Sequence, residues 1–210
     1  MVRSALPRHQ PIPPDWLPEG LDIATARIAG ADEVGRGSGA GPFLAASVVI
    51  PVGIAVPPDL DDSKRFDPRG KRIAELAAWV DEYCLVHSVL YSVEEIDAIG
   101  IGRANIEAFE RLIEINGADL TIVDGNLPLR ATRPFRCEVR AERFDAVAAA
   151  SVWAKVTRDR LMNDIAAAHP GFGLESAGYL TPEAIAAIRG QGRIPGVHRI
   201  SFRIRGLDYR

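Results

Sequence analysis

Two adjacent acids and a run of alternating glycines separate two strand-like segments, and this arrangement limits the possible folds more than any other part of the sequence. The first segment covers residues 27–34 and contains Asp32 and Glu33, glycines alternate over 35–41, and a β-branched run begins at Phe43. A dinucleotide-binding loop places its glycines between a strand and a helix. Here a second strand pattern follows, and two carboxylates would repel a phosphate. The segment therefore predicts a β-hairpin and argues against a nucleotide-binding oxidoreductase domain.

The two acids serve one site only if the backbone bends. Neighbouring residues of a strand point to opposite faces of the sheet, whereas glycines directly after them permit a bend and let main-chain N–H groups approach a ligand. Asp32 and Glu33 are therefore candidate site residues. An exposed acidic strand end in front of an ordinary glycine hairpin is the alternative interpretation.

Hydrophobic periodicity predicts helices and strands in alternation after the hairpin. Apolar residues repeat at helical spacing over 73–80, and Ser92 forms a capping box with Glu95. Asp145 is a candidate N-cap of an alanine-rich helix, and Thr181 of the last helix. Three early strands followed by helices and strands predict an α/β fold with a mixed sheet. The expected strands are 27–34, 43–50, 84–91 and 120–123, and the expected helices begin at 68, 92, 103, 146 and 181.

Composition and the N-terminal region indicate the type of protein. The 210 residues are 47% hydrophobic with a mean hydropathy of +0.02, which is typical of one globular domain. Residues 1–24 hold five of the fifteen prolines, which predicts a flexible or draped extension before a domain at 25–210. No apolar run approaches the roughly 20 residues of a bilayer span, no signal peptide is recognisable, and Cys84 and Cys137 form no disulfide framework. A cytoplasmic protein without membrane attachment is predicted.

The net charge of −3 hides a segregation of charge along the chain. Acids dominate residues 81–129, bases dominate 130–160 and 189–210, and nearly all bases are arginines. A guanidinium gives phosphate two aligned hydrogen bonds. The pattern predicts at least one basic face that suits a polyanion. Arginines spread over ordinary solvated surfaces are the alternative.

A further acid ends a second apolar strand. Residues 120–123 lead directly into Asp124 and a glycine, although an aspartate at such a place is often a simple turn residue. If this strand lies beside the first one, Asp32, Glu33 and Asp124 converge, and each close carboxylate pair is repelled by about 1 to 4 kcal/mol. A divalent cation relieves that repulsion. A set of oxygen ligands favours Mg²⁺ or Mn²⁺ over zinc.

Six short motifs occur in order between about residues 28 and 202. They are Asp32-Glu33-Val34-Gly35-Arg36-Gly37, Asp62-Ser63-Lys64, Val123-Asp124-Gly125, a helix segment at 148–159, Gly178-Tyr179 with Thr181, and His198-Arg199 with Ser201-Phe202. Together they resemble the ribonuclease HII family, the type 2 ribonucleases H. The resemblance implies an α/β, ribonuclease H-like fold with a mixed five-stranded sheet flanked by helices and a helical C-terminal part.

The resemblance also implies an activity. Enzymes of this kind are endonucleases that hydrolyse the RNA strand of RNA/DNA hybrids and nick duplex DNA 5′ of an embedded ribonucleotide, leaving 3′-hydroxyl and 5′-phosphate ends. A monomer that uses two Mg²⁺ or Mn²⁺ ions and acts in DNA replication and ribonucleotide excision repair is implied. The implied catalytic metal ligands are Asp32, Glu33 and Asp124. The implied substrate-binding residues are Gly35, Arg36 and Gly37 at the ribose 2′-hydroxyl, Tyr179 at the sugar, and Lys64, Ser151 and Lys155.

One departure from the family affects the candidate catalytic site. The family usually carries a fourth acid in a Gly-Asp pair before the helix segment, and this pair falls on Arg140-Ala141. Glu142 or Asp145 is predicted to supply the missing carboxylate, and Glu142 is preferred as the fourth catalytic residue. Without such a substitute, the alternative is a hybrid-binding homologue with impaired hydrolysis.

Basic residues near the expected substrate depart from the family as well. Ser176 and Ala177 replace a His-Lys pair before Tyr179, which predicts weaker phosphate binding there. Lys155 lies four residues before Asp159 on one helix, so an i,i+4 ion pair is expected. The arginines predicted to compensate as phosphate contacts are Arg143, Arg158, Arg189 and Arg193.

Overall fold

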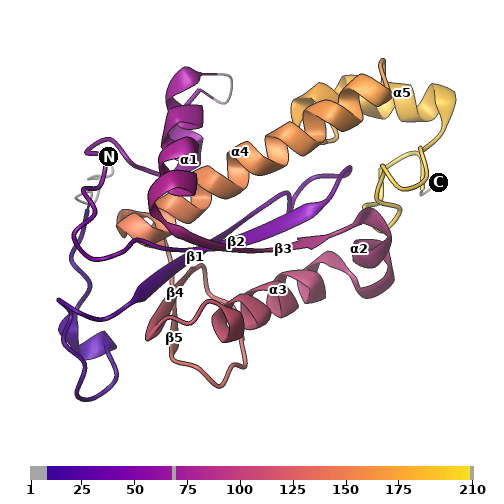
Figure 1. Ribbon diagram of the computed structural model, residues 1–210. Coiled ribbons are helices and arrows are strands. Elements are labelled where there is room, and N and C mark those ends of the chain that lie inside the picture. Colours follow the sequence, from indigo (N-terminus) through magenta and orange to yellow (C-terminus); the bar gives the residue numbers. More distant parts are fainter. Residues whose placement is uncertain (1–8, 68–69, 209–210) are drawn as a thin grey trace, which may run out of the picture.

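The predicted hairpin forms the centre of a five-stranded sheet. The computed structural model describes residues 9–67 and 70–208, so residues 1–8 of the predicted extension lie outside the described residues. The strands are β1 (Ile28–Val34), β2 (Phe43–Val49), β3 (Leu85–Tyr91), β4 (Leu120–Asp124) and β5 (Phe135–Glu138), and their order in the sheet is β3-β2-β1-β4-β5 (Figure 1). β1 is antiparallel to β2 and parallel to β4. The sheet is therefore mixed, as predicted.

Helices cover both faces of this sheet. They are α1 (Lys71–Tyr83), α2 (Val93–Ile99), α3 (Ile101–Ile115), α4 (Asp145–Ala168) and α5 (Pro182–Gln191). α4 crosses one face with α1 beside it, and α3 lies on the opposite face (Figure 1). All seven residues of β2 are buried because both of its faces are covered. The predicted fold class is confirmed.

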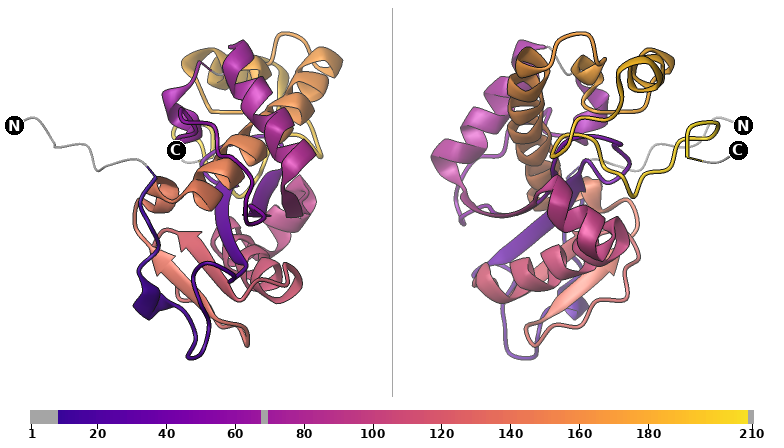
Figure 2. Two further views of the ribbon diagram at one scale, coloured as in Figure 1. Left: turned by 60° about the vertical axis from the view of Figure 1, so that its left-hand side comes forward. Right: turned by 90° about the vertical axis from the view of Figure 1, so that its right-hand side faces the viewer.

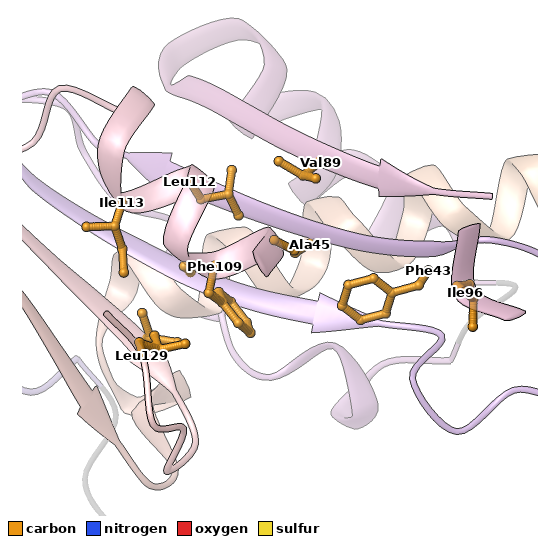
Figure 3. Close-up of a cluster of buried hydrophobic side chains, with 11 residues drawn as sticks. Phe43, Ala45, Val89, Ile96, Phe109, Leu112, Ile113 and Leu129 are labelled. Carbon is orange, nitrogen blue, oxygen red and sulfur yellow. The ribbon is translucent and has the colours of Figure 1, made fainter. Parts of the chain in front are cut away.

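The core between the sheet and α3 is built from large apolar side chains. Phe43 and Ala45 of β2 meet Phe109 and Leu112 of α3, and Ile96 of α2 closes one end of the cluster (Figure 3). The opposite face of β2 contributes to a second cluster with the helical stripe of α1 and the alanines of α4. The stripe predicted over residues 73–80 is thus confirmed as the buried side of α1.

α4 lies unusually close to β1 because small residues face each other. A Cβ atom built on Gly30 would fall 2.1 Å from the main-chain nitrogen of Val147 and 2.2 Å from the carbonyl carbon of Ala146. Ala149 and Ala150 are fully buried on the same helix. This contact holds the strand that carries Asp32 against the helix that carries the 148–159 motif.

Several local expectations are confirmed and others are corrected. Ser92 and Glu95 form both hydrogen bonds of the capping box, and Thr181 caps α5. Asp145 is not an N-cap: Phe144 occupies that position, and the Asp145 side chain instead bonds His9 at 2.6 Å. β5 was not expected, since this four-residue edge strand carries two charged residues and no buried one. Short polar edge strands lack the alternation that identifies a strand from sequence.

The described part of the proline-rich segment lies along β4 and β5 (Figure 2). Trp16 packs edge-on against Phe144 at 5.5 Å between ring centroids, and the guanidinium of Arg136 lies 4.5 Å from the Trp16 ring. The Gln10 N–H donates to the Arg143 carbonyl at 3.0 Å. Residues 9–17 are thus draped over the sheet edge, while the domain boundary at residue 24 stays a prediction.

The C-terminal segment after α5 returns to the sheet side of the molecule. The carboxylate of Asp97 in α2 accepts hydrogen bonds from the N–H groups of Ile200 and Ser201, so this segment lies beside α2 (Figures 1 and 2). Within residues 9–67 and 70–208, no helix combines the length and the apolar character that crossing a membrane requires.

Candidate active site

The acids of the first and fourth strands end at the same edge of the sheet. β1 and β4 are parallel neighbours, and Ala31 is paired with Val123. Asp32 and Asp124, which follow these two residues, therefore lie side by side, Asp124 at the carboxyl end of β4 and Asp32 two residues before the end of β1. The strand adjacency on which the sequence argument depended is confirmed.

Neighbouring negative charges shift the pKa values of Asp32 and Glu33. Burial and the charges of Glu33 and Asp124 together raise the pKa of Asp32 to about 7, while a hydrogen bond from Ser151 opposes the shift. Burial also raises the pKa of Glu33, which the nearby Arg36 partly offsets and Asp124 increases. The Asp32 carboxylate accepts the Glu33 N–H at 2.7 Å. The site therefore holds negative charge at a free-energy cost.

The raised pKa of Asp32 predicts that the folding stability of the metal-free protein depends on pH. The pKa of Asp32 is about 7 in the folded state against 3.8 without the fold, so the folded state binds more protons between these values. Stability must then fall as pH rises from about 4 to 7, by up to about 4 kcal/mol, and stay level above that window. Urea unfolding in the presence of a chelator, repeated from pH 4 to 8, measures this. A stability that rises across this window would contradict the burial of an ionised Asp32.

The donor chemistry of the site fits a hard divalent cation. Asp32, Glu33 and Asp124 offer only oxygen atoms, and the positive charge of an ion would offset the repulsion that helps to raise the pKa values of Asp32 and Glu33. In the part of the chain that the structure describes, no three acidic, histidine or cysteine side chains are gathered closely enough to hold a metal ion. Asp124 instead accepts the Ala141 N–H at 2.8 Å. The three candidate ligands lie on neighbouring strands, and binding an ion would require their side chains to turn toward one another.

A cleft of about 200 Å³ opens beside Asp32 and Glu33. The glycine turn at 35–37 forms one wall, and Tyr179, with 53% of its surface exposed, stands at the other side of this turn. The structure thus brings together most of the predicted substrate-binding residues. Those lining the cleft are Gly35, Arg36, Gly37, Lys64, Ser151, Lys155 and Tyr179.

Ser63 and Lys64 join this cleft through contacts that span the chain. The hydroxyls of Ser151 on α4 and Ser63 are hydrogen-bonded at 3.0 Å, which ties the loop of Lys64 to the helix. Burial alone would lower the pKa of Lys64, but the surrounding carboxylates of Asp62, Asp32, Asp124 and Glu142 raise it. The Lys64 ammonium is therefore held in its charged form at the acidic edge of the cleft.

The region of the missing fourth acid forms a short 3₁₀ turn, η3 (Ala141–Arg143). Ala141 is fully buried and contributes only its N–H to Asp124. Arg140 before it has a φ of 62°, a left-handed conformation that favours glycine. Burial raises the pKa of Glu142, and the charge of Asp124 raises it further, so these two carboxylates are near enough to interact electrostatically. Asp145 points instead toward His9.

Two of the predicted substrate-binding side chains, Arg143 and Lys155, form ion pairs with other residues of the chain. Arg143 does not line the cleft: its guanidinium bonds Glu138 at 2.7 Å and lies 4.6 Å from the Phe144 ring. Its proposed phosphate contact stays a prediction that this arrangement does not favour. Lys155 forms the expected i,i+4 ion pair with Asp159, at the wall of the cleft.

The arginines expected to compensate as phosphate contacts are engaged elsewhere. The prediction is wrong for Arg158, which is 1% exposed and donates only to main-chain carbonyls. Arg193 pairs with Asp208 at 2.7 Å, and Arg189 donates to the Arg205 carbonyl at 3.2 Å. Sequence spacing gave no signal for these partners because each lies at least 15 residues away in the chain.

A mixed sheet with acids on adjacent parallel strand ends, beside a cleft lined by lysines and main-chain N–H donors, defines a nuclease of the ribonuclease H-like fold. The family model described as Ribonuclease HII matches residues 29–204. The chain belongs to the ribonuclease HII family and is an endoribonuclease of that family.

Relatives and solved structures agree with this assignment. A ribonuclease HII from Ruegeria pomeroyi is 43% identical over 198 residues, covering 90% of this chain and 82% of the relative. Another, from Paramagnetospirillum magneticum, is 42% identical over 182 residues, covering 83% and 89%. The ribonuclease HII in a PCNA complex from Archaeoglobus fulgidus has a TM-score of 0.70 at 25% identity, over 85% of this chain and 96% of that one. A Bst ribonuclease HIII solved with Mn²⁺ shares the fold, with a TM-score of 0.66 at 19% identity over 85% and 68%.

Proposed function

We propose that this ribonuclease HII nicks duplex DNA on the 5′ side of an embedded ribonucleotide and also cuts the RNA strand of RNA/DNA hybrids, leaving 3′-hydroxyl and 5′-phosphate ends. The observation that carries the proposal is the cleft itself, in which the acids of β1 lie directly beside a glycine turn and an exposed tyrosine. A phosphodiester at the acids then has its neighbouring sugar at the turn. A cytoplasmic location belongs to the same proposal, and because one chain supplies all the residues that line the cleft, a monomer suffices.

Mg²⁺ or Mn²⁺ is the proposed cofactor, in a two-metal site. Asp32, Glu33 and Asp124 would hold the ions, with Glu142 as a fourth ligand. When bound, two such ions lower the pKa of the attacking water and stabilise the leaving oxygen. Support comes from the oxygen-only donor set, from the mutual repulsion of the carboxylates, and from the Mn²⁺ bound to the Bst ribonuclease HIII.

The remaining cleft residues would bind and orient the duplex. Main-chain N–H groups of the 35–37 turn are suited to the ribose 2′-hydroxyl, which alone distinguishes RNA from DNA at that position. The exposed ring of Tyr179 is suited to packing against the sugar, and the charged Lys64 to a backbone phosphate. Ser151 and Lys155 form the opposite wall from α4.

A cleavage assay tests this function. The protein is incubated with Mg²⁺ or Mn²⁺ and a DNA duplex that contains one ribonucleotide, and the products are mapped for position and end groups. A nick 5′ of the ribonucleotide with a 5′-phosphate is expected. Tight binding of the duplex without any nick would instead identify a hybrid-binding homologue that has lost hydrolysis.

Glu142→Gln should lower nicking by about 10- to 100-fold and weaken Mn²⁺ binding, because it removes the carboxylate that we propose as the replacement for the fourth acid, whose position is taken by the buried Ala141. Calorimetric titration of Mn²⁺ and the nicking rate are the two measurements. Asp145→Asn is the matched control, since its carboxylate is bonded to His9 and should leave both quantities within about twofold. Full activity in Glu142→Gln would show that Glu142 does not replace the fourth acid.

A further inference from the structure

Two arginines lie buried beneath the glycine turn. Arg158 is 1% exposed and Arg199 is fully buried. Neither guanidinium has a carboxylate within ion-pair distance among residues 9–67 and 70–208. Burial lowers the pKa of Arg158 to about 10 and that of Arg199 to about 9. A buried charge is retained only where hydrogen bonds replace its hydration, so the acceptors of these two groups indicate what they do.

Arg199 bonds the start and the end of the glycine-rich loop. Its Nη1 donates to the Gly35 carbonyl at 2.7 Å, and its Nε donates to the Gly41 carbonyl at 2.9 Å. The Gly35 oxygen also accepts the Ser38 N–H at 3.3 Å, so residues 35–38 form a β-turn. Both lone pairs of the Gly35 carbonyl are therefore used, and the peptide plane after Gly35 is fixed.

Arg158 supports the same loop from α4. It donates to the carbonyls of Pro42 at 2.8 Å, Ala177 at 3.0 Å and Ala40 at 3.2 Å. Gly35 rests directly on this guanidinium, because a Cβ atom at Gly35 would lie 2.2 Å from Arg158 Nε. The two arginines thus hold the loop by its carbonyl groups.

Fixing the carbonyls also determines where the N–H groups point. In a trans peptide the C=O and N–H bonds point in opposite directions, so a Gly35 carbonyl drawn toward Arg199 turns the Arg36 N–H away from it. The main-chain N–H groups of Gly35, Arg36 and Gly37 find no acceptor within the described residues, and all three residues line the cleft. Free donors at a turn are suited to an oxygen of a ligand.

We propose that Arg199, with Arg158 beside it, is a positioning residue that sets the preference of this enzyme for ribose over deoxyribose. It does so by holding the 35–38 turn with its N–H groups directed into the cleft. The proposal rests on the proposed function, in which this turn meets the 2′-hydroxyl. Lysine cannot replace arginine here, because one ammonium cannot bridge the carbonyls of Gly35 and Gly41 as the planar guanidinium does.

The test compares binding of two duplexes by Arg199→Lys and the wild-type protein. One DNA duplex carries a single ribonucleotide and the other is all DNA, and dissociation constants are measured by fluorescence anisotropy in chelator, so that no nicking occurs. We expect the dissociation constant for the all-DNA duplex, divided by that for the ribonucleotide-containing duplex, to fall about tenfold in Arg199→Lys. The all-DNA constant itself should stay within about twofold of wild type. Arg160→Lys, an exposed arginine on α4, is the control and should keep the wild-type ratio.

A folded Arg199→Lys protein that keeps the wild-type ratio overturns the proposal, even if its nicking rate is lower. If this variant does not fold, Arg158→Lys provides the second test, because it withdraws the support beneath Gly35 while Arg199 remains. Its ratio must fall too, and an unchanged ratio overturns the proposal. Failure of the proposed function is seen separately, as a wild-type protein that does not nick the ribonucleotide-containing duplex.

Discussion

Asp32→Asn should abolish nicking and at the same time stabilise the metal-free protein. Asp32 lies at the end of the central strand, its pKa is raised by burial, and Glu33 and Asp124 repel its charge. Asparagine removes a ligand from the proposed metal site, and a loss of about 4 kcal/mol of transition-state stabilisation lowers the rate at least about 10³-fold. It also removes a buried charge, which should raise the free energy of unfolding at pH 8 by about 2 to 4 kcal/mol.

The two effects have separate measurements. Nicking of a duplex with one ribonucleotide in Mg²⁺ gives the first, and urea unfolding in chelator gives the second, repeated at pH 4, where the wild-type and variant stabilities should converge. Asp164→Asn, an exposed acid on α4, serves as the control and should change neither. Substantial nicking by Asp32→Asn would remove this residue from the catalytic site. A variant that is less stable than wild type at pH 8 would contradict the electrostatic account.

Gly30→Ala should be the most destabilising small change in the sheet. The new Cβ would lie 2.1 Å from the Val147 nitrogen and 2.2 Å from the Ala146 carbonyl carbon. Both are backbone atoms, so no side chain can rotate away, and α4 must move off β1. Overpacking of this kind costs about 3 kcal/mol. Nicking should fall as well, because the shift separates the strand of Asp32 from the helix of Ser151.

Thermal or urea unfolding of Gly30→Ala measures the loss of stability. Gly102→Ala is a matched control: it makes the same chemical change in α3, where a Cβ meets nothing within 4 Å. Helix propensity predicts that this control gains a few tenths of a kcal/mol or more. Equal stability of Gly30→Ala and wild type would show that α4 does not pack on β1 as closely as described.

Local patterns in the sequence predicted most of the helices and strands. The apolar stripe of α1, the capping box of Ser92 and the β-branched run of β2 each depend on neighbours a few residues apart, so periodicity reveals them. The edge strand β5 has no such signature, and its pairing with β4 supplies what its own residues lack. The N-cap expected at Asp145 failed for a related reason, since His9, far away in sequence, takes its carboxylate.

The candidate site shows the same division. Order and spacing of the motifs located the acids, the glycine turn and the residues of α4, and the strand order then placed Asp32 beside Asp124. The sequence did not predict the directions in which the long arginine side chains point. Arg143 turns to Glu138, a near neighbour in the chain, whereas Arg158 turns inward to carbonyls of residues distant in the chain that only folding brings beside it.

The sequence by itself thus predicted the family, the five helices, four of the five strands, and the residue types that this nuclease brings to a phosphodiester. Only the tertiary structure decided that buried Arg199 holds the glycine turn and that Arg158 turns inward to main-chain carbonyls, whereas the role of Glu142 stays a prediction. The physical reason is the separation along the chain of the residues that interact. Periodicity, capping and motif spacing act between residues close in the chain, whereas burial, repulsion and hydrogen bonding act between atoms that only folding brings within a few ångströms.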